Sequence, residues 1–255
     1  LITEAETIWI TDARGRAYPG CVLGYDQETG LGIVQALQKM DLPPLPIGRS
    51  SEVRRHDPML VVGAGDDDHC VEAGVIAKRE FAGYWEYLLD EAIFTAPAHP
   101  NWGGAALVNA AGELCGIGSL LVQQVAQSGD QAGANMIVPI DLLQPIWEDL
   151  RTCGRPNRPA RPWLGMLVQD IGEHLVVSGV YDGGPAEKAG IEVGDLVVAV
   201  SGQRPKTLAN LWRSIWKLGP AGTEIPLIMS RKGEAYPTTI ESQDRNTRLK
   251  VGQIH

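Results

Sequence analysis

The sequence predicts a mostly β protein with more than one domain, and three observations support this prediction. Short apolar or alternating runs, typical of strands, recur between turn residues over the first 140 positions. Residues 154–162 hold three prolines and three arginines, a composition that indicates a linker. The length of 255 residues is sufficient for about two domains.

The first strands are expected at residues 5–10 and 21–25, joined by turn residues at 12–16 into a hairpin. Residues 41–50 contain three prolines and are expected to form a connector, because proline interrupts helices and sheet ladders. Residues 81–94 are expected to lead directly into a loop at 99–107. Further strands are predicted at residues 59–63, 71–77, 136–140 and on both sides of a turn within 107–118.

A helix is predicted from Asp141 to Arg151, with Asp141 as its N-terminal cap and Pro145 in its first turn. Its apolar face is expected to consist of Leu142, Leu143, Ile146, Trp147 and Leu150.

Composition narrows the possible partners. The net charge of −9, with lysines and arginines dispersed, argues against nucleic acid and anionic membranes. No apolar run approaches the roughly 20 residues that a membrane-spanning helix needs. The chain begins at Leu1 without a signal-peptide pattern, so we expect a processed or truncated start. Protein or peptide partners are therefore favoured.

No cofactor or metal is expected. The four cysteines (Cys21, Cys70, Cys115 and Cys153) lack the CxxC spacing of zinc and thioredoxin-like sites. Their even number leaves two disulfides open, with small buried side chains as the alternative. The three adjacent carboxylates Asp66–Asp68 do not alternate as calcium ligands do, so a solvated hairpin tip is expected there.

The loop at 99–107, HPNWGGAAL, resembles the nucleophile loop of trypsin-fold serine proteases of the HtrA/Deg type, whose pattern is Gly-Asn-Ser-Gly-Gly. Trp102 stands at the serine position and Pro100 at the first glycine position. An indole cannot attack a carbonyl as a serine hydroxyl does. The oxyanion hole of this family uses the N–H groups of those two positions, and proline has no N–H. The resemblance therefore implies a degenerate catalytic site.

The segment DQETGLGIV at 26–34 resembles the family segment that carries the catalytic aspartate, and Gly30 occupies that position. We expect Gly30 to serve a tight turn. Residues 1–5 resemble the segment that follows the catalytic histidine, which would then lie just upstream of Leu1. None of His56, His69, His99, His174 and His255 has the family context.

The segment after the linker resembles an HtrA PDZ domain through several motifs in order. WLGM at 163–166 matches the carboxylate-binding loop, and GPAEKAG at 184–190 matches a single helical turn ended by glycine. VGDLVVAVSG at 193–202 matches a strand, and apolar residues recur at helical spacing from 207 to 218.

The resemblance implies a trypsin-like double β-barrel, with only part of the first barrel present, followed by an α+β PDZ domain. Its expected segments are a partial first barrel at 1–40, a second barrel with a C-terminal helix at 41–153, a linker at 154–162, the PDZ domain at 163–243 and a tail at 244–255.

PDZ domains bind extended C-terminal peptides along a strand edge, with backbone N–H groups holding the terminal carboxylate. The N–H groups of residues 163–165 are expected to hold that carboxylate. The peptide-binding residues implied by the resemblance are Trp163, Leu164, Gly165, Met166, Val168, Trp212 and Ile215. Trp212, Ile215 and Trp216 line the pocket or fill the core, and at helical spacing the core is favoured for at least two of them.

The resulting hypothesis is a catalytically inactive HtrA-like homologue, regulatory or chaperone-like, that binds protein C-termini. One alternative is an active endopeptidase with a rearranged site. Another is a docking subunit of a larger complex. The resemblance also implies a periplasmic or other extracytoplasmic location, and a homo-oligomer is compatible with it.

Overall fold

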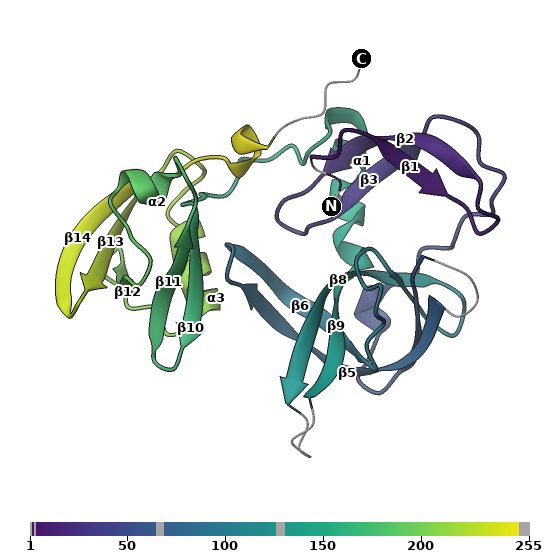
Figure 1. Cartoon of the computed structure of the whole chain (residues 1–255), viewed down its shortest axis with the longest axis horizontal. Helices are drawn as coiled ribbons and strands as arrows, with labels where there is room; N and C mark the ends of the chain where they lie inside the picture. Colours follow the sequence, from purple (N-terminus) through teal and green to yellow (C-terminus); the bar gives the residue numbers. More distant parts are fainter. Residues whose placement is uncertain (1, 3, 65–68, 126–130, 250–255) are drawn as a thin grey trace. The chain divides into compact units, whose positions relative to one another are not determined.

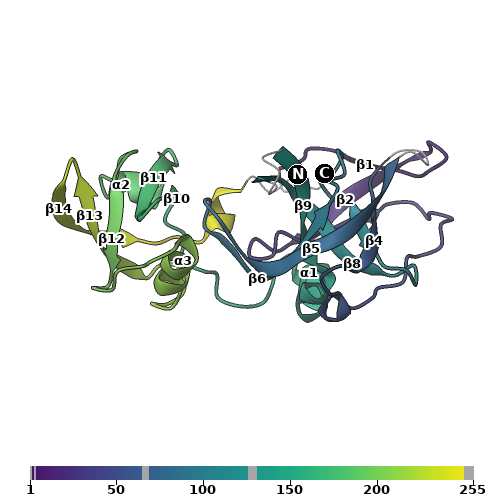
Figure 2. The same cartoon turned by 90° about the horizontal axis from the view of Figure 1, so that it is seen from below.

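The computed structural model describes residues 2, 4–64, 69–125 and 131–249 (Figures 1 and 2). The described chain divides into two compact units. One contains residues up to 80 and from 89 to 157. The other combines Phe81–Leu88 with residues 158–249. Asp66–Asp68, for which a solvated tip was expected, and His255 lie outside the described residues.

The first unit begins with a small antiparallel sheet in the order β1-β2-β3. Its strands are β1 (Ile8–Thr11), β2 (Ala17–Tyr25) and β3 (Gly32–Ala36). The β1–β2 turn is held by Asp12, whose carboxylate accepts the N–H groups of Arg14 and Arg16 at 2.9 Å each. The predicted hairpin is therefore present, with a third strand added to it.

A closed barrel follows, in the order β4-β5-β6-β9-β8-β7. Its interior is filled by apolar side chains that alternate along the strands, including Val61, Ile93, Leu107, Cys115 and Ile137. The strands are β4 (Pro58–Val62), β5 (Cys70–Gly83), β6 (Tyr87–Ala96), β7 (Ala106–Val108), β8 (Leu114–Val125) and β9 (Gln131–Pro139).

The chain reverses direction within the stretch that the sequence analysis treated as leading directly into the loop. β5 ends at Gly83 and β6 begins at Tyr87, so residues 84–86 form a turn. Glu86 has a φ of 61°, a backbone conformation that non-glycine residues rarely adopt. Tyr-Trp-Glu lacks the glycine, proline and asparagine that usually mark turns, which explains why the sequence did not reveal it.

The segment after β9 differs from the predicted single helix. It consists of two 3₁₀ turns, η3 (Ile140–Leu142) and η4 (Gln144–Ile146), and then α1 (Trp147–Cys153). The cap assignment of Asp141 was wrong: its carboxylate accepts the N–H groups of Ser50 and Ser51, at 2.9 Å each, in the 3₁₀ turn η1 (Ser50–Glu52). Trp147 was wrongly placed on a buried face, because it is 44% exposed.

The four cysteines all lie within the described residues, and none forms a disulfide. Cys115 is buried in the barrel, as expected for a small apolar side chain, whereas Cys70 and Cys153 are exposed.

The second unit contains a five-stranded antiparallel sheet in the order β10-β11-β12-β13-β14 (Figure 1). Its elements are β10 (Met166–Ile171), β11 (His174–Val180), α2 (Pro185–Lys188), β12 (Leu196–Val200), α3 (Leu208–Trp216), β13 (Glu224–Arg231) and β14 (Glu234–Glu241). The Thr207 hydroxyl caps α3 by accepting the N–H of Asn210 at 3.1 Å.

The core of this unit lies between the sheet and α3. Leu211, Trp212 and Ile215 of α3 are fully buried, as are Met166 and Val168 of β10. Beyond β14, the 3₁₀ turn η5 (Arg245–Arg248) packs back on the unit, since Arg248 donates to the carbonyls of Gly183 and Asp182. This fold leaves β10 as an edge strand beside α3.

Candidate functional site

The loop that resembles a nucleophile loop is fixed by backbone hydrogen bonds to β8. The N–H of Gly104 donates to the Gly118 carbonyl at 2.8 Å, and the N–H of Gly118 donates to the Ala105 carbonyl at 2.7 Å. A Cβ atom on Gly118 would approach the Trp102 carbonyl oxygen to 2.1 Å. Glycine at 118 therefore permits the loop to lie against the strand. Trp102 itself is partly buried and Pro100 is exposed.

His99, the histidine nearest to Trp102 in sequence, has both ring nitrogens engaged by backbone groups. Its Nδ1 accepts the N–H of Asn101 at 3.0 Å, so its Nε2 carries the proton and donates to the His69 carbonyl at 2.7 Å. The ring is buried, and the His99 N–H donates to Asn135 Oδ1 at 2.7 Å. His99 is thus a structural residue of the loop.

Gly30, which the resemblance places at the position of the catalytic aspartate, lies in the β2–β3 turn with a φ of 78°. Its N–H donates to the Asp26 carbonyl at 2.8 Å. The Asp26 carboxylate is buried and accepts from the N–H groups of Glu28 and Thr29 and from the Thr29 hydroxyl. The hydrogen bonds named here for Gly30 and Asp26 join residues of the same turn. The hydrogen bonds of Gly104 and Gly118, by contrast, join the Trp102 loop to β8.

A nest of backbone N–H groups lies at the start of β10. The N–H groups of Leu164, Gly165 and Met166 donate to the Glu86 carboxylate at 2.9, 2.8 and 3.3 Å. From the sequence, this nest was predicted one residue earlier, at residues 163–165. The N–H of Trp163 is engaged elsewhere, because it donates to the Gln243 carbonyl at 3.0 Å. The nest can hold one carboxylate, which is the chemistry of C-terminal recognition.

The edge of β10 and the helix α3 both contact the turn between β5 and β6. The N–H of Val168 donates to the Tyr84 carbonyl at 2.9 Å, and Trp212 Nε1 donates to the Gly83 carbonyl at 3.0 Å. Trp212 and Ile215 are core residues. The indole N–H of Trp212 also donates to the turn between β5 and β6, at the Gly83 carbonyl. Among the residues assigned to peptide binding, Leu164, Gly165, Met166, Val168 and Trp212 contact one segment, the turn between β5 and β6.

Glu86 was missed by the sequence analysis, since a lone glutamate between aromatic residues carries no local signal. Desolvation on burial raises the pKa of Glu86 to about 7, against the opposing effects of the N–H groups of Leu164, Met166 and Gly165 and of the positive charge of Arg245. Burial therefore disfavours the ionised form of this carboxyl group, while hydrogen bonds from the three N–H groups stabilise that form.

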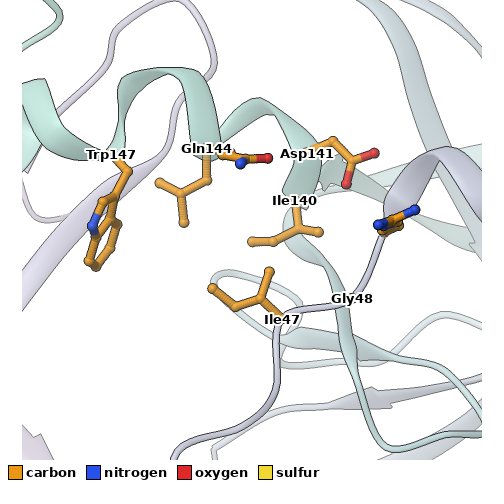
Figure 3. Close-up of a pocket in the computed structure, with 8 residues that line it drawn as sticks. Ile47, Gly48, Ile140, Asp141, Gln144 and Trp147 are labelled. Carbon is orange, nitrogen blue, oxygen red and sulfur yellow. The ribbon is translucent and has the colours of Figure 1, made fainter.

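A second concavity lies in the first unit, between the connector that precedes η1 and the turns η3 and η4 (Figure 3). It has a volume of about 300 Å³. Figure 3 shows Ile47, Ile140 and Trp147 around it, with the Asp141 carboxylate at one side. That carboxylate is already engaged by Ser50 and Ser51. Ile47 and Trp147 are exposed at this concavity, whose lining combines apolar and polar side chains.

Within the part of the chain that the structure describes, no helix combines the length and the apolar character needed to cross a membrane. The described residues also contain no group of three or more His, Cys, Asp or Glu side chains arranged to hold a metal ion.

In the comparisons with known proteins, each of the two units matches a family model. A family model described as a trypsin-like peptidase domain matches residues 1–117, and one described as a PDZ domain matches residues 176–225. A protein named probable periplasmic serine endoprotease DegP-like, from Pseudomonas fluorescens, is 26% identical over 267 aligned positions that cover 100% of this chain. Its counterpart from Hahella chejuensis is 24% identical over 94% of the chain. The chain spans 52% of the length of each of these relatives.

Solved structures give the same result. The HtrA-type protease AlgW with decapeptide is 25% identical, with a TM-score of 0.55 over 94% of this chain and 76% of that one. A serine endoprotease from Yersinia pestis is 25% identical, with a TM-score of 0.53 over 94% of this chain and 81% of that one. The mostly β fold predicted from the sequence is confirmed. The chain therefore contains a trypsin-like peptidase domain and a PDZ domain, and its relatives and structural neighbours are HtrA/DegP-type serine endoproteases.

Proposed function

We propose that this chain is a proteolytically inactive HtrA-type homologue that binds the C-termini of proteins through its PDZ groove. The observation that carries the proposal is the nest at Leu164, Gly165 and Met166, whose three N–H groups converge on a single carboxylate. The outer edge of β10, the first strand of its sheet, and the helix α3 would extend the site for an extended peptide. In two solved structures of the HtrA-type protease AlgW, a decapeptide or a tripeptide is present, which supports the same use here.

The inactivity follows from the residues of the loop. Trp102 and Pro100 stand where peptide hydrolysis needs a hydroxyl and an N–H. His99, in the same loop, has no ring nitrogen left to act as a base. We place the protein in the periplasm, because the curated relatives are named as periplasmic endoproteases.

Peptide binding is tested with fluorescent decapeptides that have apolar last residues. Binding is expected for the free carboxylate and at least tenfold weaker for the C-terminal amide, because the amide cannot accept from all donors of the nest. Fluorescence anisotropy measures both dissociation constants. Equal affinity for the acid and the amide would contradict recognition of C-termini.

The nest itself is tested by Gly165→Ala. Gly165 has a φ of 74°, and a Cβ there would lie 3.1 Å from the Trp163 ring and 3.2 Å from Pro185. Alanine is strained at this φ and its neighbouring side chains must give way, so peptide affinity is expected to fall about tenfold. The matched control is Gly172→Ala, which has a similar φ of 64° but open space around the new methyl group. A similar loss in both variants would point to general strain rather than to the nest.

The inactivity is tested by labelling with a fluorophosphonate, which reacts with an activated serine. No covalent label and no digestion of casein are expected, with an active trypsin-like protease as the positive control. Labelling of any serine of the folded chain would establish the alternative, an active endopeptidase with rearranged residues.

A further inference from the structure

We propose that the turn between β5 and β6, residues Phe81–Leu88, is an internal ligand of the PDZ groove that an external peptide must displace. In this arrangement the Glu86 side chain takes the place of a peptide's terminal carboxylate. The inference rests on the proposed function, because it names how the same groove is regulated. We call residues 81–88 the tip; it belongs to the same compact unit as the groove.

The tip fills the place of a terminal carboxylate through its acidic side chain. The Glu86 carboxylate accepts from three consecutive N–H groups, those of Leu164, Gly165 and Met166. A turn that merely packed on the domain would bury apolar side chains there, because burying a carboxylate is unfavourable unless donors surround it. The same donors cannot serve a second carboxylate at the same time, so occupation by Glu86 and by a peptide terminus is mutually exclusive.

The tip also pairs with the strand edge that a peptide would use. The Tyr84 carbonyl accepts from the N–H of Val168, two residues further along β10 than Met166. Tyr84 in turn lies two residues before Glu86. The tip therefore runs antiparallel to β10 with its carboxylate at the nest, which is the direction and spacing expected of a C-terminal peptide added to a strand edge.

Three further contacts hold the tip in place. On the helix side, Trp212 Nε1 donates to the Gly83 carbonyl, and Ala82 packs against the core of the unit. On the other side, Arg245 of η5 donates to the Trp85 carbonyl at 3.4 Å. Within the tip, the rings of Trp85 and Tyr87 stack, with centroids 5.5 Å apart. The groove is thus filled from the nest to α3 by a segment of the chain itself.

The physical consequence is competition at high effective concentration. A tethered segment occupies the groove without losing the translational freedom that a free peptide loses on binding. Only the fraction of molecules with the tip released can bind a peptide, so the apparent affinity is reduced by that fraction. A substitution that weakens the contacts between the tip and the groove should therefore strengthen peptide binding.

The test uses the full chain and a pool of fluorescent decapeptides with free carboxylates and apolar last residues. Glu86→Ala removes the internal carboxylate and is expected to increase peptide affinity at least tenfold. The control is Glu173→Ala, an exposed glutamate in the β10–β11 turn of the same unit, for which no change is expected. Thermal melting establishes that each variant is folded.

A second measurement avoids substitution. In the unaltered chain, hydrogen exchange is followed with and without saturating peptide. Amides of residues 81–88 are expected to exchange faster when peptide is bound, while those of residues 164–168 become or stay protected. Peptide binding with no gain for Glu86→Ala and with protection of 81–88 retained would overturn the internal ligand and leave the proposed function standing. Absence of binding to both the unaltered chain and Glu86→Ala would overturn both.

Discussion

Replacing Asp195 with alanine is expected to lower the free energy of unfolding of the PDZ unit by about 3 kcal/mol. The Asp195 side chain is 1% exposed. It accepts from Arg231 Nε at 2.7 Å, from the Tyr236 hydroxyl at 2.8 Å and from the N–H of Glu192 at 2.9 Å. The variant leaves the partly exposed Arg231 guanidinium without its buried partner. Urea denaturation of the full chain, followed by far-UV circular dichroism, measures the change.

The acid dependence of stability follows from the same carboxylate. The side-chain hydrogen bond from Arg231 is the largest cause that lowers the pKa of Asp195, from 3.8 to about 2. Because the folded pKa lies below the unfolded one, the ionised form stabilises the fold by about 2 kcal/mol at neutral pH. This contribution is complete above about pH 5 and is lost as the pH falls through 3.8 toward 2.

Asp195→Asn should therefore show a weaker decrease in stability between pH 5 and pH 2 than the unaltered chain.

The control for Asp195→Ala is Asp170→Ala, since Asp170 is exposed on β10 of the same unit. It is expected to change the free energy of unfolding by less than about 0.5 kcal/mol. An Asp195→Ala variant as stable as this control would show that the cluster around Arg231 contributes no net stability.

The second large effect is expected for Gly118→Ala, in the barrel beneath the Trp102 loop. The added methyl group would lie 2.1 Å from the Trp102 carbonyl oxygen and 3.4 Å from the Ala105 side chain. Backbone atoms cannot yield as a flexible side chain does, so the loop and β8 must separate. The two hydrogen bonds that join Gly118 to Gly104 and Ala105 are then strained. The expected loss of stability is about 3 kcal/mol.

Gly74→Ala is the matched control for this variant. Gly74 also lies in a barrel strand, β5, and a Cβ there meets no atom within 4 Å. This substitution is expected to be neutral or slightly stabilising, because alanine reduces the entropy of the unfolded chain. Hydrogen exchange of residues 99–105, measured in both variants, shows whether the loop separates from β8. Equal stability of the two variants would contradict the close approach at Gly118.

Much of the second unit could be predicted from the sequence because its signals are local. The helical spacing of Leu208, Leu211, Trp212 and Ile215 gives α3, and the glycine after residues 184–189 ends the short α2. In β4 of the barrel, buried and exposed residues alternate as expected for a strand with one buried face. The resemblance to HtrA-type proteases was evident from ordered motifs, and the comparisons find a trypsin-like peptidase domain, a PDZ domain and DegP-like relatives.

Other assignments could not be made from local pattern. Asp141 has the sequence of a helix cap, but its carboxylate binds N–H groups of Ser50 and Ser51, some 90 residues earlier in the chain. Trp163 lies in the carboxylate-binding motif, but its N–H pairs with Gln243. In each case a distant backbone partner competes successfully with the nearby one, and spacing along the sequence carries no information about that partner.

By itself, the sequence determined the mostly β fold, its trypsin-like and PDZ parts and the presence of tryptophan at position 102, because each depends on residue identities and short spacings. Only the tertiary structure decided which group the N–H donors of Leu164, Gly165 and Met166 contact. Glu86 and Leu164 are 78 residues apart in sequence, and their contact exists because a turn of one hairpin brings a carboxylate to three backbone N–H groups. Those donors are common to every sequence, so only folding could show that they converge.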